Sequence, residues 1–144
     1  MDKTAVTTLA TLCVVLLAPR DGWSQERTAA GAQAYLRTAA AGRSVEYTPN
    51  GFRGSGKPIL SAETEGECTT RFLGEPPTWV RINWRTVSAV ELPRPWGDGF
   101  RVDVTGGGFA DFAFFVPSET AANRLQTAAD FLRIRCDPNA GSGF

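Results

Sequence analysis

The segment from Pro117 to Asp137 constrains the fold most, because its periodicity, its start signal and its cysteine agree. Ser118 is a predicted N-cap, Glu119 places an acid in the first turn, and Pro138 prevents the helix from continuing. Apolar residues spaced three or four apart form one face of this segment: Ala121, Leu125, Ala128, Leu132 and Cys136. The charged residues lie mostly on the opposite side. The sequence therefore predicts an amphipathic helix that must pack on another layer.

The chain before this helix alternates apolar and polar residues as strands do, in about five stretches: 44–48, 59–72, 79–91, 100–105 and 109–116. The second and third stretches are predicted to form an antiparallel hairpin through residues 73–78. In the third, alternation predicts an inward set of Val80, Ile82, Trp84 and Val87. The last stretch is rich in phenylalanine, which predicts burial on both faces or under the helix.

Residues 26–41 are rich in alanine, with Tyr35 and Leu36 as the large apolar groups, and Gly42 follows as a helix terminator. A first helix is predicted here; the alternative is a flexible linker. The order of helix, strands and helix predicts an α+β fold, with a bent antiparallel sheet or partial barrel of about five strands and the C-terminal helix packed on it.

Residues 1–24 are predicted to be an export signal peptide, because Lys3 precedes an apolar run and small residues flank the end of the segment. The run is shorter than the roughly 20 apolar residues that span a bilayer, so no stable membrane span is expected. The alternative is an uncleaved, loosely ordered N-terminus. Residues 25–144 are then expected to form a single domain in the periplasm or outside the cell.

Cysteine pairing follows from that expected compartment. With Cys13 inside the signal peptide, Cys68 and Cys136 remain, and pairing is the default in an oxidising environment. A Cys68–Cys136 disulfide is therefore predicted; the alternative is two unpaired buried thiols.

The chain contains no histidine, and its 15 basic and 15 acidic residues balance. Ser-His-Asp and Cys-His catalysis and histidine-ligated zinc are excluded, and neither a cofactor nor a metal site is predicted. Because the net charge is zero, no long-range field draws the chain to nucleic acid.

Two glycine motifs resemble functional loops but are interpreted as turns. The spacing from Gly51 to Lys57 matches a phosphate-binding loop, yet Pro58 follows where Ser or Thr is needed and no helix begins there. The three glycines at 106–108 have no nucleophile to serve as an oxyanion hole, so they are predicted to form a hairpin turn.

Glu63, Glu65 and Glu67 alternate along one predicted strand face. Carboxylates in this arrangement are compatible with calcium binding or with paired acid–base groups. The favoured interpretation is an exposed ladder of ion pairs with the arginines of the next strand, Arg81 and Arg85.

The stretch from Leu92 to Gly99 contains prolines and glycines and is predicted to be a loop between strands. Trp96 is the best contact candidate, because an amphipathic aromatic beside an arginine is typical of interface hot spots. Arg94, Trp96 and Asp98 are therefore the predicted partner-binding residues, and no catalytic residue is assigned. The alternative is that Trp96 folds back as a lid over the end of the sheet.

The chain from about Gln33 to Asp137 resembles small exported bacterial domains with a pleckstrin-homology-like (PH-like) roll. The resemblance is carried by a helix with Ala34-Tyr35-Leu36-Arg37, strands with Glu67-Cys68-Thr69 and with residues 82–88, and a last helix with residues 121–125 that finishes near Cys136. It implies an interaction module.

The leading functional hypothesis is thus a non-catalytic binding protein of the bacterial envelope with a protein partner. One alternative is a small-ligand or lipid carrier with a cavity between the last helix and the phenylalanine-rich strand. The other is an envelope hydrolase that uses Glu63, Glu65 or Glu67 with Asp103 or Asp111.

Overall fold

The computed structural model describes residues 28–41, 46–49, 57–74 and 78–140. The predicted signal peptide and most of the Gly51–Lys57 motif lie outside these residues. The elements are, in chain order, α1 (Ala29–Ala41), β1 (Glu46–Pro49), β2 (Lys57–Thr64), β3 (Thr69–Gly74), β4 (Thr78–Asn83), the 3₁₀ helix η1 (Trp84–Thr86), β5 (Val87–Val90), β6 (Arg94–Trp96), β7 (Gly99–Gly106), β8 (Phe109–Val116) and α2 (Glu119–Cys136).

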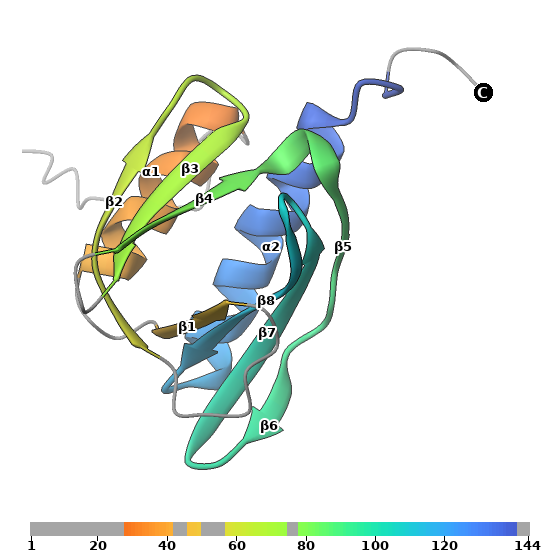
Figure 1. The fold of residues 1–144 in the computed structure, drawn as a ribbon. Coiled ribbons are helices and arrows are strands. Elements are labelled where there is room, and N and C mark those ends of the chain that lie inside the picture. Colours follow the sequence, from red (N-terminus) through yellow and green to blue (C-terminus); the bar gives the residue numbers. More distant parts are fainter. Residues whose placement is uncertain (1–27, 42–45, 50–56, 75–77, 141–144) are drawn as a thin grey trace, which may run out of the picture.

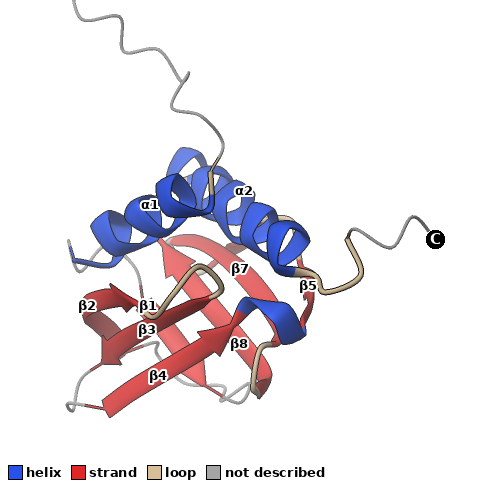
Figure 2. Cartoon of the chain, turned by 90° about the horizontal axis from the view of Figure 1, so that it is seen from above, coloured by secondary structure: helices blue, strands red, loops and turns tan. Residues whose placement is uncertain are grey.

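The strands form a strongly bent antiparallel sheet in the order β4-β3-β2-β1-β8-β7-β5, with β6 also paired to β7 (Figure 1). β4 and β5 are the two ends of this path, yet they are joined in sequence by η1 alone. Both helices lie on the same side of the sheet (Figure 2). The predicted α+β class, with the C-terminal helix packed on the sheet, is confirmed.

Among the described residues the sheet contains eight strands rather than about five, because two of the predicted stretches contain corners and a short strand, β6, lies in the predicted loop. Residues 59–72 do not form one strand: Gly66 has a φ of +71°, and Glu65 N–H donates to the Thr69 carbonyl at 2.9 Å, which closes a turn between β2 and β3. Glu67 therefore lies in the turn rather than beside Glu63 and Glu65.

The second corner is η1, which interrupts the stretch 79–91. The Asn83 side chain accepts a hydrogen bond from Arg85 N–H at 3.1 Å and so caps the 3₁₀ turn. The turn after β7 holds the corner from outside, because Gly107 N–H donates to the Thr86 carbonyl and Asn83 N–H donates to the Gly107 carbonyl, each at 3.1 Å. A Cβ at Gly106 would lie 2.3 Å from the Thr86 carbonyl oxygen, so the backbone approach requires glycine there.

Helix α2 begins as predicted, since the Ser118 hydroxyl accepts a hydrogen bond from Ala121 N–H at 3.3 Å. The predicted core face is shifted at its two alanines: Ala122 and Ala129 are fully buried, whereas Ala121 and Ala128 are partly buried beside them. The face is wide because α2 packs on α1 as well as on the sheet.

The core is centred on three phenylalanines that join the two arms of the bent sheet. Phe72 of β3 lies 6.1 Å from Phe112 and 5.6 Å from Phe114 of β8, measured between ring centroids. The inward set predicted from the third stretch, including Trp84, is also buried. Burial of such side chains is the main favourable term in folding.

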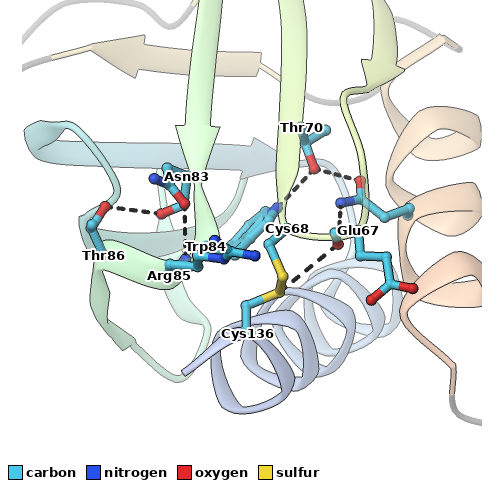
Figure 3. Close-up of a disulfide and its surroundings, with 9 residues drawn as sticks. Glu67, Cys68, Thr70, Asn83, Trp84, Arg85, Thr86 and Cys136 are labelled. Carbon is cyan, nitrogen blue, oxygen red and sulfur yellow. Dashed lines mark hydrogen bonds between the residues drawn. A yellow bond between two sulfur atoms is a disulfide. The ribbon is translucent and has the colours of Figure 1, made fainter. Parts of the chain in front are cut away.

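The predicted disulfide between Cys68 and Cys136 is present, with the two Cα atoms 5.7 Å apart (Figure 3). It joins the turn between β2 and β3 to the last residue of α2. The Cys68 carbonyl also accepts a hydrogen bond from Trp84 N–H at 2.9 Å, so the same residue contacts the η1 corner.

A buried relay of hydrogen bonds lies beside the disulfide. The Trp84 indole N–H donates to the Thr70 hydroxyl at 2.8 Å, and that hydroxyl donates to the Gln33 side-chain oxygen at 2.5 Å. The Gln33 amide nitrogen donates in turn to the Glu67 carbonyl at 3.2 Å. Gln33 is 2% exposed and Thr70 and Trp84 are 0% exposed, so the relay satisfies polar groups that water cannot reach.

Replacing Thr70 by valine is expected to destabilise the fold by about 1–3 kcal/mol, because the Trp84 N–H and the Gln33 oxygen would both lose their buried partner. Urea unfolding measures the change. The control is Thr69→Val on the neighbouring, less buried position of the same strand. Equal effects of the two substitutions would contradict the relay's role.

Replacing both Cys68 and Cys136 by alanine is expected to lower the free energy of unfolding by about 2–5 kcal/mol, because the bridge closes a long loop in the unfolded chain. Chemical denaturation of the oxidised protein and the variant measures the difference. A loss below about 1 kcal/mol would show that the bridge is not a principal constraint on the fold.

Candidate functional site

The best candidate for a binding surface lies on the outer face of β6, β7 and β8. The strand register places Arg94 opposite Arg101 and Arg101 opposite Phe115. Side chains two residues apart share a face, which adds Trp96 and Asp103. We call this set the Trp96 patch: Arg94, Trp96, Arg101, Asp103 and Phe115.

Trp96 is the centre of the patch and is 46% exposed. The guanidinium carbons of Arg94 and Arg101 lie 5.5 and 5.0 Å from its ring centroid, within cation–π distance. The Phe115 ring lies 6.3 Å from the Trp96 ring and also contacts Arg101, at 5.5 Å. The indole therefore lies against its neighbours and leaves about half of its surface open to solvent.

Asp103 holds both arginines in place. Its carboxylate accepts from Arg94 at 2.9 Å and from Arg101 at 2.6 Å, one arginine on each oxygen. The Asp103 side chain is 13% exposed and that of Arg101 is 16% exposed, so this pair is screened from water more than a usual surface ion pair. Two arginines share one carboxylate, which leaves the patch with a net positive charge.

The predicted site residues are only in part brought together. Arg94 and Trp96 contact each other, but they lie on a short strand rather than in the predicted loop. Pro95 fits there because it faces Phe100 on an edge strand, where a missing N–H is tolerated. Asp98 lies exposed in the turn after β6, and none of the ion pairs found among the described residues involves it.

Trp96 does not form the alternative lid over the sheet end, because its ring lies on the outer sheet face. Sequence reasoning did not single out Arg101 or Phe115, and it considered Asp103 only as a carboxylate for hydrolysis, not as a member of this patch. A signal for two of them was present, since Arg101 and Asp103 alternate with the buried Val102 and therefore had to point outward.

A second charged cluster lies on the outer face of β2, β3 and β4, where the ladder of ion pairs was predicted. Arg71 pairs with Glu63 and, at 3.3 Å, with Glu65, and Arg81 pairs with Glu65 at 2.7 Å. The hydrogen bond to Glu63 raises the pKa of the Arg71 guanidinium above its ordinary value. The predicted ladder is thus present in altered form: Arg71 provides its centre, and Glu67 lies in the turn.

The carboxylates considered for hydrolysis are not gathered in one place. Glu63 and Glu65 lie near the β4 end of the sheet and pair with arginines, whereas Asp103 is on β7, with β1 and β8 between β2 and β7. The side chain of Asp111 lies outside the described residues.

The region considered for a ligand cavity is filled by side chains. Phe112, Phe114, Leu125 and Leu132 are each no more than 1% exposed between β8 and α2. An open depression lies elsewhere, between the start of α1 and the last turns of α2; it is lined by Thr28, Ala29, Ala30, Glu67, Phe131 and Arg135.

Within the described part of the chain, no group of three His, Cys, Asp or Glu residues is arranged to hold a metal ion. No helix in those same residues is long and apolar enough to cross a membrane. The sequence matches no protein-family model, and no curated protein is similar to it at a significant level.

Replacing Asp103 by asparagine is expected to destabilise the fold by about 1–3 kcal/mol, because it removes a shielded charge that binds two arginines. The matched control is Asp130→Asn, which breaks the more exposed Asp130–Arg133 pair on α2 and should cost about 0.3–0.5 kcal/mol. Thermal unfolding measures both, and equal losses would contradict the special role of Asp103.

Proposed function

We propose that this chain is an exported, non-catalytic binding module of the bacterial envelope, with a PH-like roll, that binds a protein partner through the Trp96 patch. The observation that carries the proposal is the half-exposed Trp96 between two arginines that one shielded carboxylate holds in place. Tryptophan and arginine are enriched among residues that dominate binding energy.

The patch is pre-organised for binding. An exposed arginine loses side-chain freedom when it is captured by a partner, which reduces affinity. Here Asp103 and the indole ring already restrict Arg94 and Arg101 before any partner arrives. The β6–β7–β8 pairing holds the backbone beneath them in register, so the partner meets a fixed surface.

The chemistry of the patch indicates the kind of partner. Its excess positive charge favours a protein surface that carries carboxylates, and the indole favours an apolar or aromatic side chain beside them. Arg94 is the more accessible of the two arginines, with half of its side chain exposed, and is the expected contact for the carboxylate. Such binding should weaken as the salt concentration rises.

The paired state of the carboxylates supports the non-catalytic part of the proposal. Glu63, Glu65 and Asp103 are each engaged in an ion pair with arginine rather than placed beside one another, which is the arrangement of structural rather than paired catalytic carboxylates. The disulfide supports export, because such bonds persist mainly in oxidising compartments. The predicted signal peptide at 1–24 points to the periplasm or the cell exterior.

Trp96→Ala is expected to reduce partner capture at least ~10-fold, because truncation of a central aromatic typically costs more than 1.4 kcal/mol of binding energy. The measurement is affinity purification from native envelope extract with the oxidised protein as bait, followed by binding measured on the purified partner.

The matched control is Trp79→Ala, because Trp79 is exposed to a similar degree, 42%, on β4. It should capture the partner as the native protein does. Full capture by a folded Trp96→Ala variant, or equal losses in both variants, would refute the patch as the binding surface. A co-purified small molecule without a protein partner would favour the carrier hypothesis instead.

A further inference from the structure

β4 is an end strand whose hydrogen-bonding groups can be assigned residue by residue. It pairs with β3 on one side and is the last strand of the sheet path. Trp84 N–H donates to the Cys68 carbonyl, which identifies these two residues as a hydrogen-bonded antiparallel pair. Such pairs recur every second residue, so Ile82 and Val80 also direct their N–H and C=O groups toward β3.

It follows that Trp79, Arg81 and Asn83 direct their backbone groups away from β3. Asn83 N–H is already used, since it donates to the Gly107 carbonyl. Because no second strand of the described residues pairs with β4 on this side, Trp79 and Arg81 present their N–H and C=O groups along an open edge. An edge of this kind is a template for pairing with another strand.

The side chains on this edge suit a partner strand. Trp79 is 42% exposed and Arg81 has 62% of its side chain exposed, both on the outer face. Arg71 already lies over the Trp79 ring at 4.2 Å, which shows that this indole accepts a guanidinium. Val80 between them points inward and is 5% exposed.

We propose that β4 pairs with β4 of a second copy of this chain, antiparallel and with the two-fold axis at Val80. This register opposes Trp79 of one copy to Arg81 of the other, twice, and each opposed pair can exchange both of its free N–H···O bonds. An aromatic and a cation then face each other across the strands on the outer face. The chain's zero net charge means that two copies do not repel each other at long range.

The neighbouring registers are worse for definite reasons. Centring the axis on Arg81 opposes two like charges and requires Asn83 N–H, which is already bonded. Centring it on Trp79 opposes Arg81 to Pro77, which has no N–H. Moving one copy's strand by an odd number of residues would place the edge-facing N–H and C=O groups of one copy opposite groups of the other copy that already bond to β3. The edge thus selects a single self-complementary arrangement.

The test compares Arg81→Pro with Arg81→Ala in the purified, disulfide-bonded protein by sedimentation equilibrium over a range of concentrations. Proline removes the N–H that points away from β3 and leaves the β3 ladder intact, whereas alanine keeps that N–H. Both variants lose the same Glu65 ion pair. We expect the native protein to form a dimer whose population rises with concentration. Arg81→Pro should raise the dissociation constant of the dimer at least ~10-fold more than Arg81→Ala does. The circular dichroism spectra of both variants should match that of the native protein.

Trp79→Lys provides a second route should Arg81→Pro fail to fold. It opposes lysine to Arg81 of the other copy, so dimerisation should again weaken at least ~10-fold. A native protein that stays monomeric at the highest soluble concentration would overturn the proposal. So would a native dimer that neither Arg81→Pro nor Trp79→Lys weakens, because its interface would then lie elsewhere.

Discussion

The structure depends on the junction at Cys68, where the turn between β2 and β3 meets the end of α2 and the η1 corner. The sulfur is bonded to Cys136, and the carbonyl of the same residue accepts from Trp84 N–H. Beside it, the relay through Thr70 and Gln33 adds α1 to the junction. The disulfide and these hydrogen bonds thus connect both helices, the turn and the corner. Buried polar groups that all have hydrogen-bond partners favour one arrangement of the elements that carry them.

This junction explains why the sheet bends as it does. The chain leaves β4 at η1 and enters β5 at the far end of the strand path, so the corner must be fixed for the sheet to wrap around Phe72 and Phe112. The glycine turn after β7 holds the corner from the other side. With the corner fixed, β4 is the end strand of the sheet that the described residues form. At the other end β7 pairs with both β5 and β6 on one side, and this pairing supports Trp96.

The features that could be predicted well from the sequence are those that depend on regular periodicity. The limits of α2, its Ser118 cap and the inward set around Ile82 follow from spacing and local chemistry, which act within a few residues. The turn at Gly66 was missed because strand alternation continues through it in the sequence. The relay was missed because a polar residue such as Gln33 gives no sign of burial in the sequence. Its hydrogen-bond partners lie on other elements, which come together only in the folded structure.

The same limit applies to the candidate site. Arg94 and Trp96 could be singled out by composition, but Phe115 joins them only through the register of β6, β7 and β8. The register also gives a reason to treat the patch as functional. An indole that packs on one side only gains little stability from that burial, so stability alone does not account for Trp96. Asp103 stabilises the fold and also provides order: it fixes two arginines beside Trp96, and order at a surface matters most when another molecule binds there.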